Sequence, residues 1–167
     1  NWTVEDSSLT PAVLGSAIDY DTFTTFGLTQ ATRRVSFKVK ADKTKNVAAI
    51  HLYMTKAAGT CPTYTIGLYN DDNGLPNIAT PILTKDFTVA TNAAHWEYID
   101  LPDYAWQEGK CYHFDISYKS GTIGSTNQIS VQYVRPALAP RNVLTSTNSG
   151  TTWTTTGYDP VFRVVYD

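Results

Sequence analysis

Hydrophobic and polar residues alternate along most of the chain, and a period of two is typical of half-buried β-strands. In residues 34–40, apolar side chains alternate with basic or small polar ones, which predicts one dry and one wet face. The further predicted strands cover residues 50–54, 64–68, 82–89, 96–101, 112–116, 129–133 and 161–166. The alternation assigns these side chains to the core: Val35, Phe37, Ile50, Leu52, Ile66, Leu68, Phe114 and Ile116.

Turn-forming residues separate the predicted strands. The strongest signal is the run 70–76, where Asn, Asp and Gly tolerate a left-handed backbone and Pro76 is expected to stop pairing. Eight or more short strands at this spacing predict an all-β fold, a two-sheet antiparallel β-sandwich of jelly-roll type. No linker or internal repeat divides the sequence, so residues 1–167 are expected to form a single domain.

Charge and composition narrow the class of protein. The chain carries 13 Lys and Arg against 15 Asp and Glu, a net charge of −2, which argues against a nucleic-acid partner. No apolar run is long enough to span a membrane. Tyrosine and threonine, which favour strands, are abundant. We expect an extracytoplasmic protein whose leader has been removed, or a piece of a longer chain.

Three local patterns occur in a familiar order. They are LYNDDNGLP at 68–76, WEYIDL at 96–101 and GKCYHFDI at 109–116. Together they resemble the jelly-roll accessory domains appended to secreted bacterial and archaeal glycoside hydrolases and surface proteins, over about residues 32–118. Many of those domains are carbohydrate-binding modules and others are anchor-type domains. The resemblance implies a sandwich fold and carbohydrate recognition, and it transfers no particular sugar-contacting residue.

A second pattern lies near the C-terminus. Residues 146–153 resemble the "S-x-D-x-G-x-x-W" box of sialidases and related propellers, with Asn148 in place of Asp. A propeller needs this box in blade after blade, and it occurs here once. We therefore predict a hairpin turn and no sialidase activity.

Aromatic residues are more numerous than the predicted core requires, with 4 Trp and 11 Tyr. An aromatic ring offers flat contact to the C–H face of a pyranose, while amide and guanidinium groups bond its hydroxyls. We predict glycan-binding rings at Trp106, Tyr133, Trp153 and Tyr158, with polar partners Arg135, Arg141 and Asn142. A rival site is formed by Trp96 and Tyr98, which lie about 6–7 Å apart on one face of a strand. The alternative for each ring is partial burial at the rim of the sandwich.

A structural calcium site is a further expectation for this chain. Jelly-roll modules often hold a structural calcium ion with residues near both termini, and the resemblance implies such a site here. The candidate ligands are Glu5, Asp6, Asp19, Asp21 and Asp159. The acidic run 71–73 does not fit the EF-hand spacing and is interpreted as a turn. The three histidines, His51, His95 and His113, do not have the spacing of zinc ligands and are interpreted as surface residues.

The two cysteines are predicted to form a disulfide. A bond between Cys61 and Cys111 would close a loop of about 50 residues, worth roughly 4 kcal/mol in the chain-entropy model. An even cysteine count in an extracellular all-β chain favours this pairing. A catalytic thiol is not expected, because no histidine is placed as its base.

Enzyme chemistry has little support, because none of the common nucleophile, zinc or nucleotide-binding motifs occurs. The sequence predicts a non-catalytic carbohydrate-binding module, monomeric and appended to a secreted or cell-surface protein. Two alternatives stay open. The first is an assembly subunit of a virion, pilus or surface layer, whose edge strands pair with a neighbour and whose residues 1–25 form an arm. The second is a passive anchor domain that binds no ligand.

Overall fold

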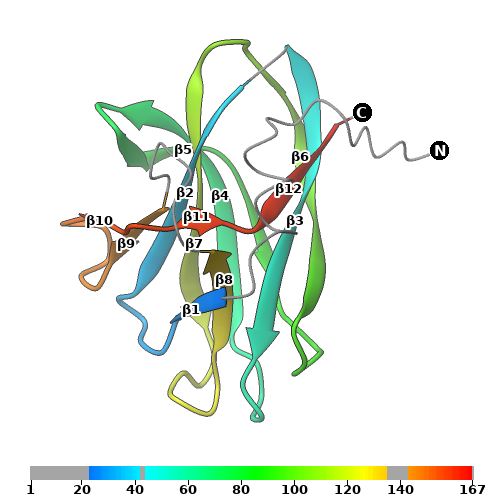
Figure 1. Cartoon of the computed structure of the whole chain (residues 1–167), viewed down its shortest axis with the longest axis vertical. Coiled ribbons are helices and arrows are strands. Elements are labelled where there is room, and N and C mark those ends of the chain that lie inside the picture. The colour runs from blue at the N-terminus through cyan, green and yellow to red at the C-terminus, as the bar shows by residue number, and fades with distance from the viewer. Residues whose placement is uncertain (1–22, 42–43, 135–142, 167) are drawn as a thin grey trace.

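The computed structural model describes residues 23–41, 44–134 and 143–166. Within these residues, two six-stranded sheets pack face to face, and the strand pairs are antiparallel (Figure 1). The predicted antiparallel β-sandwich is therefore confirmed, whereas the jelly-roll topology stays a prediction. The described part of the chain contains no helix that could cross a lipid bilayer.

We name the two sheets A and B. Sheet A has the order β1-β8-β3-β12, with β11 paired to β8 and β6 paired to β3. Its strands are β1 (Phe23–Gly27), β3 (Lys45–Lys56), β6 (His95–Trp106), β8 (Ile129–Val134), β11 (Asp159–Pro160) and β12 (Phe162–Tyr166). Sheet B has the order β10-β9-β2-β7-β4-β5. Its strands are β2 (Arg34–Lys40), β4 (Thr63–Asp72), β5 (Leu75–Phe87), β7 (Cys111–Ser120), β9 (Val143–Ser146) and β10 (Thr154–Thr155).

The core lies between the two sheets. All eight side chains assigned to it by alternation are fully buried. Phe37 of sheet B stacks on Phe162 of sheet A, with ring centroids 6.0 Å apart, so the two inner faces are in direct contact. Burying one such side chain stabilises a fold by about 1.5–3 kcal/mol. The period-two pattern thus predicted the core correctly.

The strand β5 begins earlier than the sequence predicted. Asn73 and Gly74 have positive φ angles of 54° and 91°, which suits the two-residue turn of a tight hairpin. Pairing resumes at once, with Leu75 opposite Asp72 and Pro76 opposite Asp71. The expectation that Pro76 stops pairing is wrong. Proline is tolerated here because β5 is the edge of sheet B, where its missing N–H costs no ladder bond.

The hairpin between β9 and β10 is the predicted turn at the box-like motif. The Oγ of Ser146 accepts a hydrogen bond from the Gly150 N–H at 2.9 Å, and Asn148 Oδ1 accepts one from the Thr152 N–H at 2.9 Å. Gly150 has a φ of 87°, and a Cβ there would lie 3.3 Å from the ring of Trp153. Trp153 therefore packs against its own turn.

Candidate functional site

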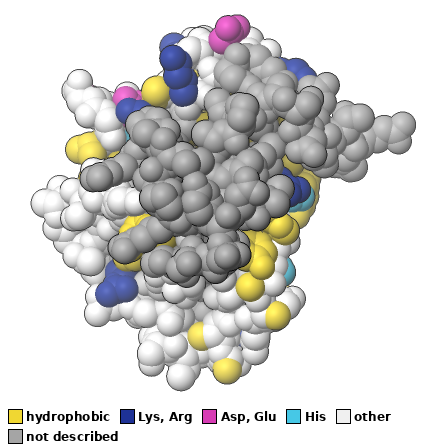
Figure 2. Space-filling model, viewed as in Figure 1, with side chains coloured by type: hydrophobic (Ala, Val, Ile, Leu, Met, Phe, Trp, Pro, Cys, Tyr) yellow, Lys and Arg dark blue, Asp and Glu magenta, His cyan; other side chains and the backbone are white. Residues whose placement is uncertain are grey.

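Three neighbouring strands of sheet A place aromatic side chains on its outer face. In the strand register, His51 and Tyr53 of β3 lie opposite Tyr98 and Trp96 of β6, and Arg163 of β12 lies opposite His51. We name these five residues the aromatic face. Tyr98 is 43% exposed and the other four are half-buried. Figure 2 shows hydrophobic and histidine side chains together at the surface on the flank where Figure 1 draws β3, β6 and β12.

Contacts within the aromatic face hold its rings in place. The edge of His51 meets Tyr98 with ring centroids 5.0 Å apart, and Tyr53 tilts against Trp96 at 5.3 Å. The guanidinium carbon of Arg163 lies 4.5 Å above the Trp96 ring, a cation–π contact. Burial, together with the positive charge of Arg163, lowers the pKa of His51 below its ordinary value. His51 is therefore neutral near pH 7.

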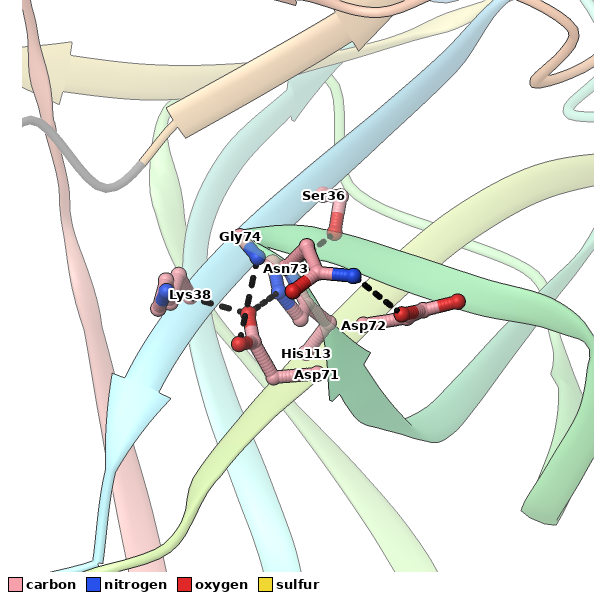
Figure 3. Close-up of polar contacts among 7 residues, drawn as sticks. All are labelled: Ser36, Lys38, Asp71, Asp72, Asn73, Gly74 and His113. Carbon is pink, nitrogen blue, oxygen red and sulfur yellow. Dashed lines mark hydrogen bonds and ion pairs between the residues drawn. The ribbon is translucent and has the colours of Figure 1, made fainter.

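The outer face of sheet B carries a different arrangement, which we name the polar cluster: Ser36, Lys38, Asp71 and His113. Figure 3 shows Lys38 and His113 both pointing at the Asp71 carboxylate. His113 Nε2 lies 2.7 Å and Lys38 Nζ 3.0 Å from Asp71 Oδ1. Ser36 Oγ lies 3.1 Å from His113 Nδ1. The chain of contacts links β2, β4 and β7.

The protonation states in the polar cluster follow from burial and from these contacts. Burial lowers the pKa of His113, although Asp71 acts in the opposite direction. A neutral His113 donates from Nε2 to Asp71 and accepts from the Ser36 hydroxyl at Nδ1. For Asp71, burial raises the pKa, but hydrogen bonds from His113, Lys38 and Gly74 outweigh it and hold the pKa below its ordinary value.

The polar cluster contains the residue types of a Ser-His-Asp triad but lacks access to a substrate. Ser36 and His113 are completely buried, so the serine oxygen cannot reach a molecule in solvent. The arrangement is a structural network that joins three strands. The interpretation of His113 as a surface histidine is wrong, because the outer face of sheet B at this position is covered.

A buried ion pair lies beside the polar cluster. Arg34 of β2 donates to Asp115 of β7 through Nε, at 2.9 Å, and through a second nitrogen. The Asp115 side chain is completely buried and that of Arg34 is 15% exposed. Burial raises the pKa of Asp115 to about 6, although Arg34 opposes this. A Cβ at Gly150 would lie 2.5 Å from Ile78 and 3.5 Å from Arg34, so the β4–β5 and β9–β10 hairpins meet beside this pair.

Two of the predicted glycan-binding rings belong to the interior. Trp106 is completely buried and packs between Tyr112, at 5.8 Å, and Tyr166, at 5.4 Å. Tyr133 is 2% exposed and stacks on Tyr158 at 5.2 Å. Both predictions are wrong, because neither ring has a face that a sugar could reach.

The other predicted residues fall into two groups. Trp153 and Tyr158 are half-buried, so their role stays a prediction. The three polar partners, Arg135, Arg141 and Asn142, lie outside the described residues. The same is true of the predicted calcium ligands Glu5, Asp6, Asp19 and Asp21, and of the Asp159 side chain. In the described part of the chain, no group of three or more His, Cys, Asp or Glu side chains is placed to hold a metal ion.

The structure contains no bond between Cys61 and Cys111, and the predicted disulfide is wrong. The strand register gives the reason. Cys61 precedes β4 and Cys111 begins β7, and these strands are antiparallel, with Thr63 opposite Ser120 and Asn70 opposite Tyr112. The two cysteines therefore lie at opposite ends of the strand pair, more than about 20 Å apart at 3.3 Å per residue. A disulfide needs Cα atoms within about 7 Å of each other.

Three residues of the polar cluster and the aromatic face were not predicted from the sequence: Ser36, His113 and Arg163. Ser36 and His113 were visible only as outward residues on separate predicted strands, and nothing in the sequence pairs those strands. Arg163 had a clearer signal, because it is the only charged residue in the otherwise apolar run 161–166. A lone arginine in such a strand indicates a specific contact on its outer face.

Comparison with known proteins adds little to this geometry. No family model matches the chain, and no curated protein matches it. Among solved structures, a family two carbohydrate esterase from Cellvibrio japonicus is similar, with a TM-score of 0.27 and 10% sequence identity. The similarity covers 83% of this chain and 35% of that protein, so the chain spans about a third of its length. A TM-score this low carries no functional inference.

Proposed function

We propose that the chain is a non-catalytic carbohydrate-binding module that holds a polysaccharide against the aromatic face. Tyr98, which is 43% exposed on the outer side of sheet A, is the observation that carries the proposal. Of the described residues, only Leu75 is another large hydrophobic side chain exposed to this degree. Attachment to a secreted enzyme or surface protein is part of the proposal.

The chemistry of the aromatic face suits a sugar. The Tyr98 ring supplies flat apolar area for the C–H groups of one pyranose, and Trp96 lies two residues away on the same strand face. His51 and Arg163 add hydrogen-bonding groups between and beside the rings. Because neighbouring side chains already fix these rings, little conformational entropy is lost when a ligand binds.

Affinity electrophoresis and calorimetry against a panel of polysaccharides test the proposal. The panel contains cellulose, xylan, mannan, starch, pectin and polygalacturonate. At least one should retard the protein, and Tyr98→Ala should weaken that binding about tenfold, because an aromatic contact is worth about 1–1.5 kcal/mol. The matched control is Leu75→Ala, which removes the other exposed large apolar side chain, 43% exposed, and should leave binding unchanged.

Two results would reject the proposal. One is an absence of binding across the panel by the folded protein. The other is binding that Tyr98→Ala and Trp96→Ala leave intact. In the first case, size-exclusion chromatography separates the remaining alternatives, because an assembly subunit should elute as an oligomer and a passive anchor domain as a monomer.

A further inference from the structure

We propose that the aromatic face selects acidic polysaccharides, with Arg163 binding the carboxylate of a uronic acid residue while Tyr98 contacts the sugar ring. This inference rests on the proposed function and narrows it to one class of glycan. The inference is based on the Arg163 guanidinium, which lies against the Trp96 ring of the aromatic face.

Arg163 differs from the other arginines that the structure describes. Arg34 is paired with Asp115, and Arg33 donates to the carbonyl oxygen of Gly27 at 2.9 Å. None of the ion pairs formed among the described residues includes Arg33 or Arg163, and the Nε of each is buried without a hydrogen-bond partner there. Arg163 differs from Arg33 because its guanidinium also makes no hydrogen bond to the described residues through its terminal nitrogens. The contact that the described residues provide is the Trp96 ring at 4.5 Å.

A half-buried cation without an anion destabilises the folded protein, and a ligand that supplies the anion offsets this effect. Removing a guanidinium from water carries a desolvation penalty, and a cation–π contact offsets only about 0.5–2 kcal/mol of it. The contact with the Trp96 ring keeps the charge of Arg163 at a fixed place on the aromatic face. The planar fork of a guanidinium matches a carboxylate with two parallel hydrogen bonds, which a lysine cannot reproduce.

The neighbours of Arg163 favour a ligand that carries both an apolar face and a negative charge. His51 lies beside Arg163 in the strand register and separates it from Tyr98. One sugar or two adjacent sugars could therefore contact the Tyr98 ring and reach the guanidinium. Asp100 is the exposed acidic residue two positions after Tyr98 on the same strand, and it should repel the carboxylate toward Arg163.

The first experiment needs no substitution. Calorimetry compares polygalacturonate with fully methyl-esterified pectin, in which the same carboxylates are masked, and with neutral galactan. We expect binding of polygalacturonate to be at least about tenfold tighter than binding of the ester, because a charge-assisted hydrogen bond contributes about 1.5–3 kcal/mol. Dextran sulfate serves as a polyanion without carboxylates and should bind more weakly than polygalacturonate.

The second experiment assigns the effect to one side chain. Arg163→Gln should weaken binding of polygalacturonate about tenfold and leave binding of the methyl ester within about twofold. Arg33→Gln is the matched control, because it removes the same charge and another cation–π contact, that of Arg33 over Phe26 at 5.4 Å. Arg163→Lys keeps the charge but loses the fork and should recover only part of the affinity. Circular dichroism confirms that each variant is folded.

The outcomes separate this inference from the function on which it rests. Equal binding of the acid and its methyl ester overturns the selection of acidic glycans and leaves carbohydrate binding intact. Equal losses in Arg163→Gln and Arg33→Gln, or tight binding of dextran sulfate, would show a general charge effect and overturn the role of Arg163. If no polysaccharide binds at all, the proposed function itself fails.

Discussion

The outer faces of the two sheets have similar sequence patterns, but their side chains differ in exposure to solvent. Each is formed by the residues that alternate with the core positions, and each includes rings, charges and a histidine. On sheet A, Tyr98 is 43% exposed, whereas Ser36 and His113 on sheet B are completely buried. Alternation therefore shows which side chains point away from the core, but it does not show which of them are exposed to solvent.

The two faces also differ in how their polar side chains are paired. On sheet B, the β4–β5 and β9–β10 hairpins meet beside Arg34, which is paired with Asp115, and Ser36, His113 and Asp71 are linked by polar contacts. Buried polar groups must be paired in this way, because an unpaired one costs about 1–3 kcal/mol. We therefore expect substitutions on sheet B to change stability and those on the aromatic face to change binding.

The largest effect is expected from the buried ion pair. Asp115→Ala leaves Arg34 as a mostly buried cation without its anion and should lower the free energy of unfolding by about 3–5 kcal/mol. Urea denaturation followed by fluorescence measures the change. Asp86→Ala is the matched control, since the Asp86 side chain is 50% exposed and lies 4.0 Å from Lys119, and it should cost less than about 1 kcal/mol. Equal effects of the two variants would contradict the contrast between a buried and a surface pair.

A smaller, pH-dependent effect is expected at His113. At pH 7.5, His113→Gln should cost about 1–2 kcal/mol, because glutamine can still donate to Asp71 but the buried Ser36 hydroxyl loses its acceptor. The pKa of His113 is lower in the folded state than in the unfolded chain, where it is about 6.5. The stability that a neutral histidine provides is therefore complete above pH 6.5 and is lost as the pH falls through 6.5 toward the folded-state pKa.

Denaturation of both proteins between pH 5 and 8 checks this sign. The difference in unfolding free energy between the wild-type protein and His113→Gln should shrink as the pH falls. Asp115, whose pKa is raised to about 6, has the opposite dependence, since its penalty grows as the pH rises through 6. That contribution is common to both proteins and cancels in the difference. A difference that grows toward acidic pH would show that His113 is stabilised in its charged form.

The smallest effect on stability is expected on the aromatic face. Tyr98→Ala removes a ring that is 43% exposed and should lower the free energy of unfolding by less than about 1 kcal/mol. The same variant should weaken glycan binding about tenfold, as described above. A large loss of stability without a loss of binding would make Tyr98 a structural residue and reverse the assignment of the two faces.

The fold was largely predictable because its signals are local. Alternation in residues 34–40 and 112–116 depends on neighbouring side chains facing opposite sides of a strand, which holds wherever the strand lies. The turns with left-handed backbone at Asn73 and Gly150 depend on residue types within a few positions. The start of β5 was missed because Pro76 is excluded from a central strand but accepted at an edge, and edge position is not a local property.

The candidate site was only partly predictable. Trp96 and Tyr98 were expected to share a face because they lie on one strand, but their partners Tyr53 and His51 come from β3 and could not be placed beside them. Trp106 was expected at the surface because it ends a strand next to a loop, yet it packs against Tyr112 and the distant Tyr166.

Spacing along the chain thus established the strands, the turns and the inward residues, since the pleat of a strand and the backbone preferences of Asn and Gly act over a few residues. Strand pairing established everything that depends on contact between distant segments. It separated Cys61 from Cys111, brought Arg163 against Trp96, and connected Ser36 through His113 to Asp71. These outcomes depend on strand order and register, and short-range patterning does not specify either.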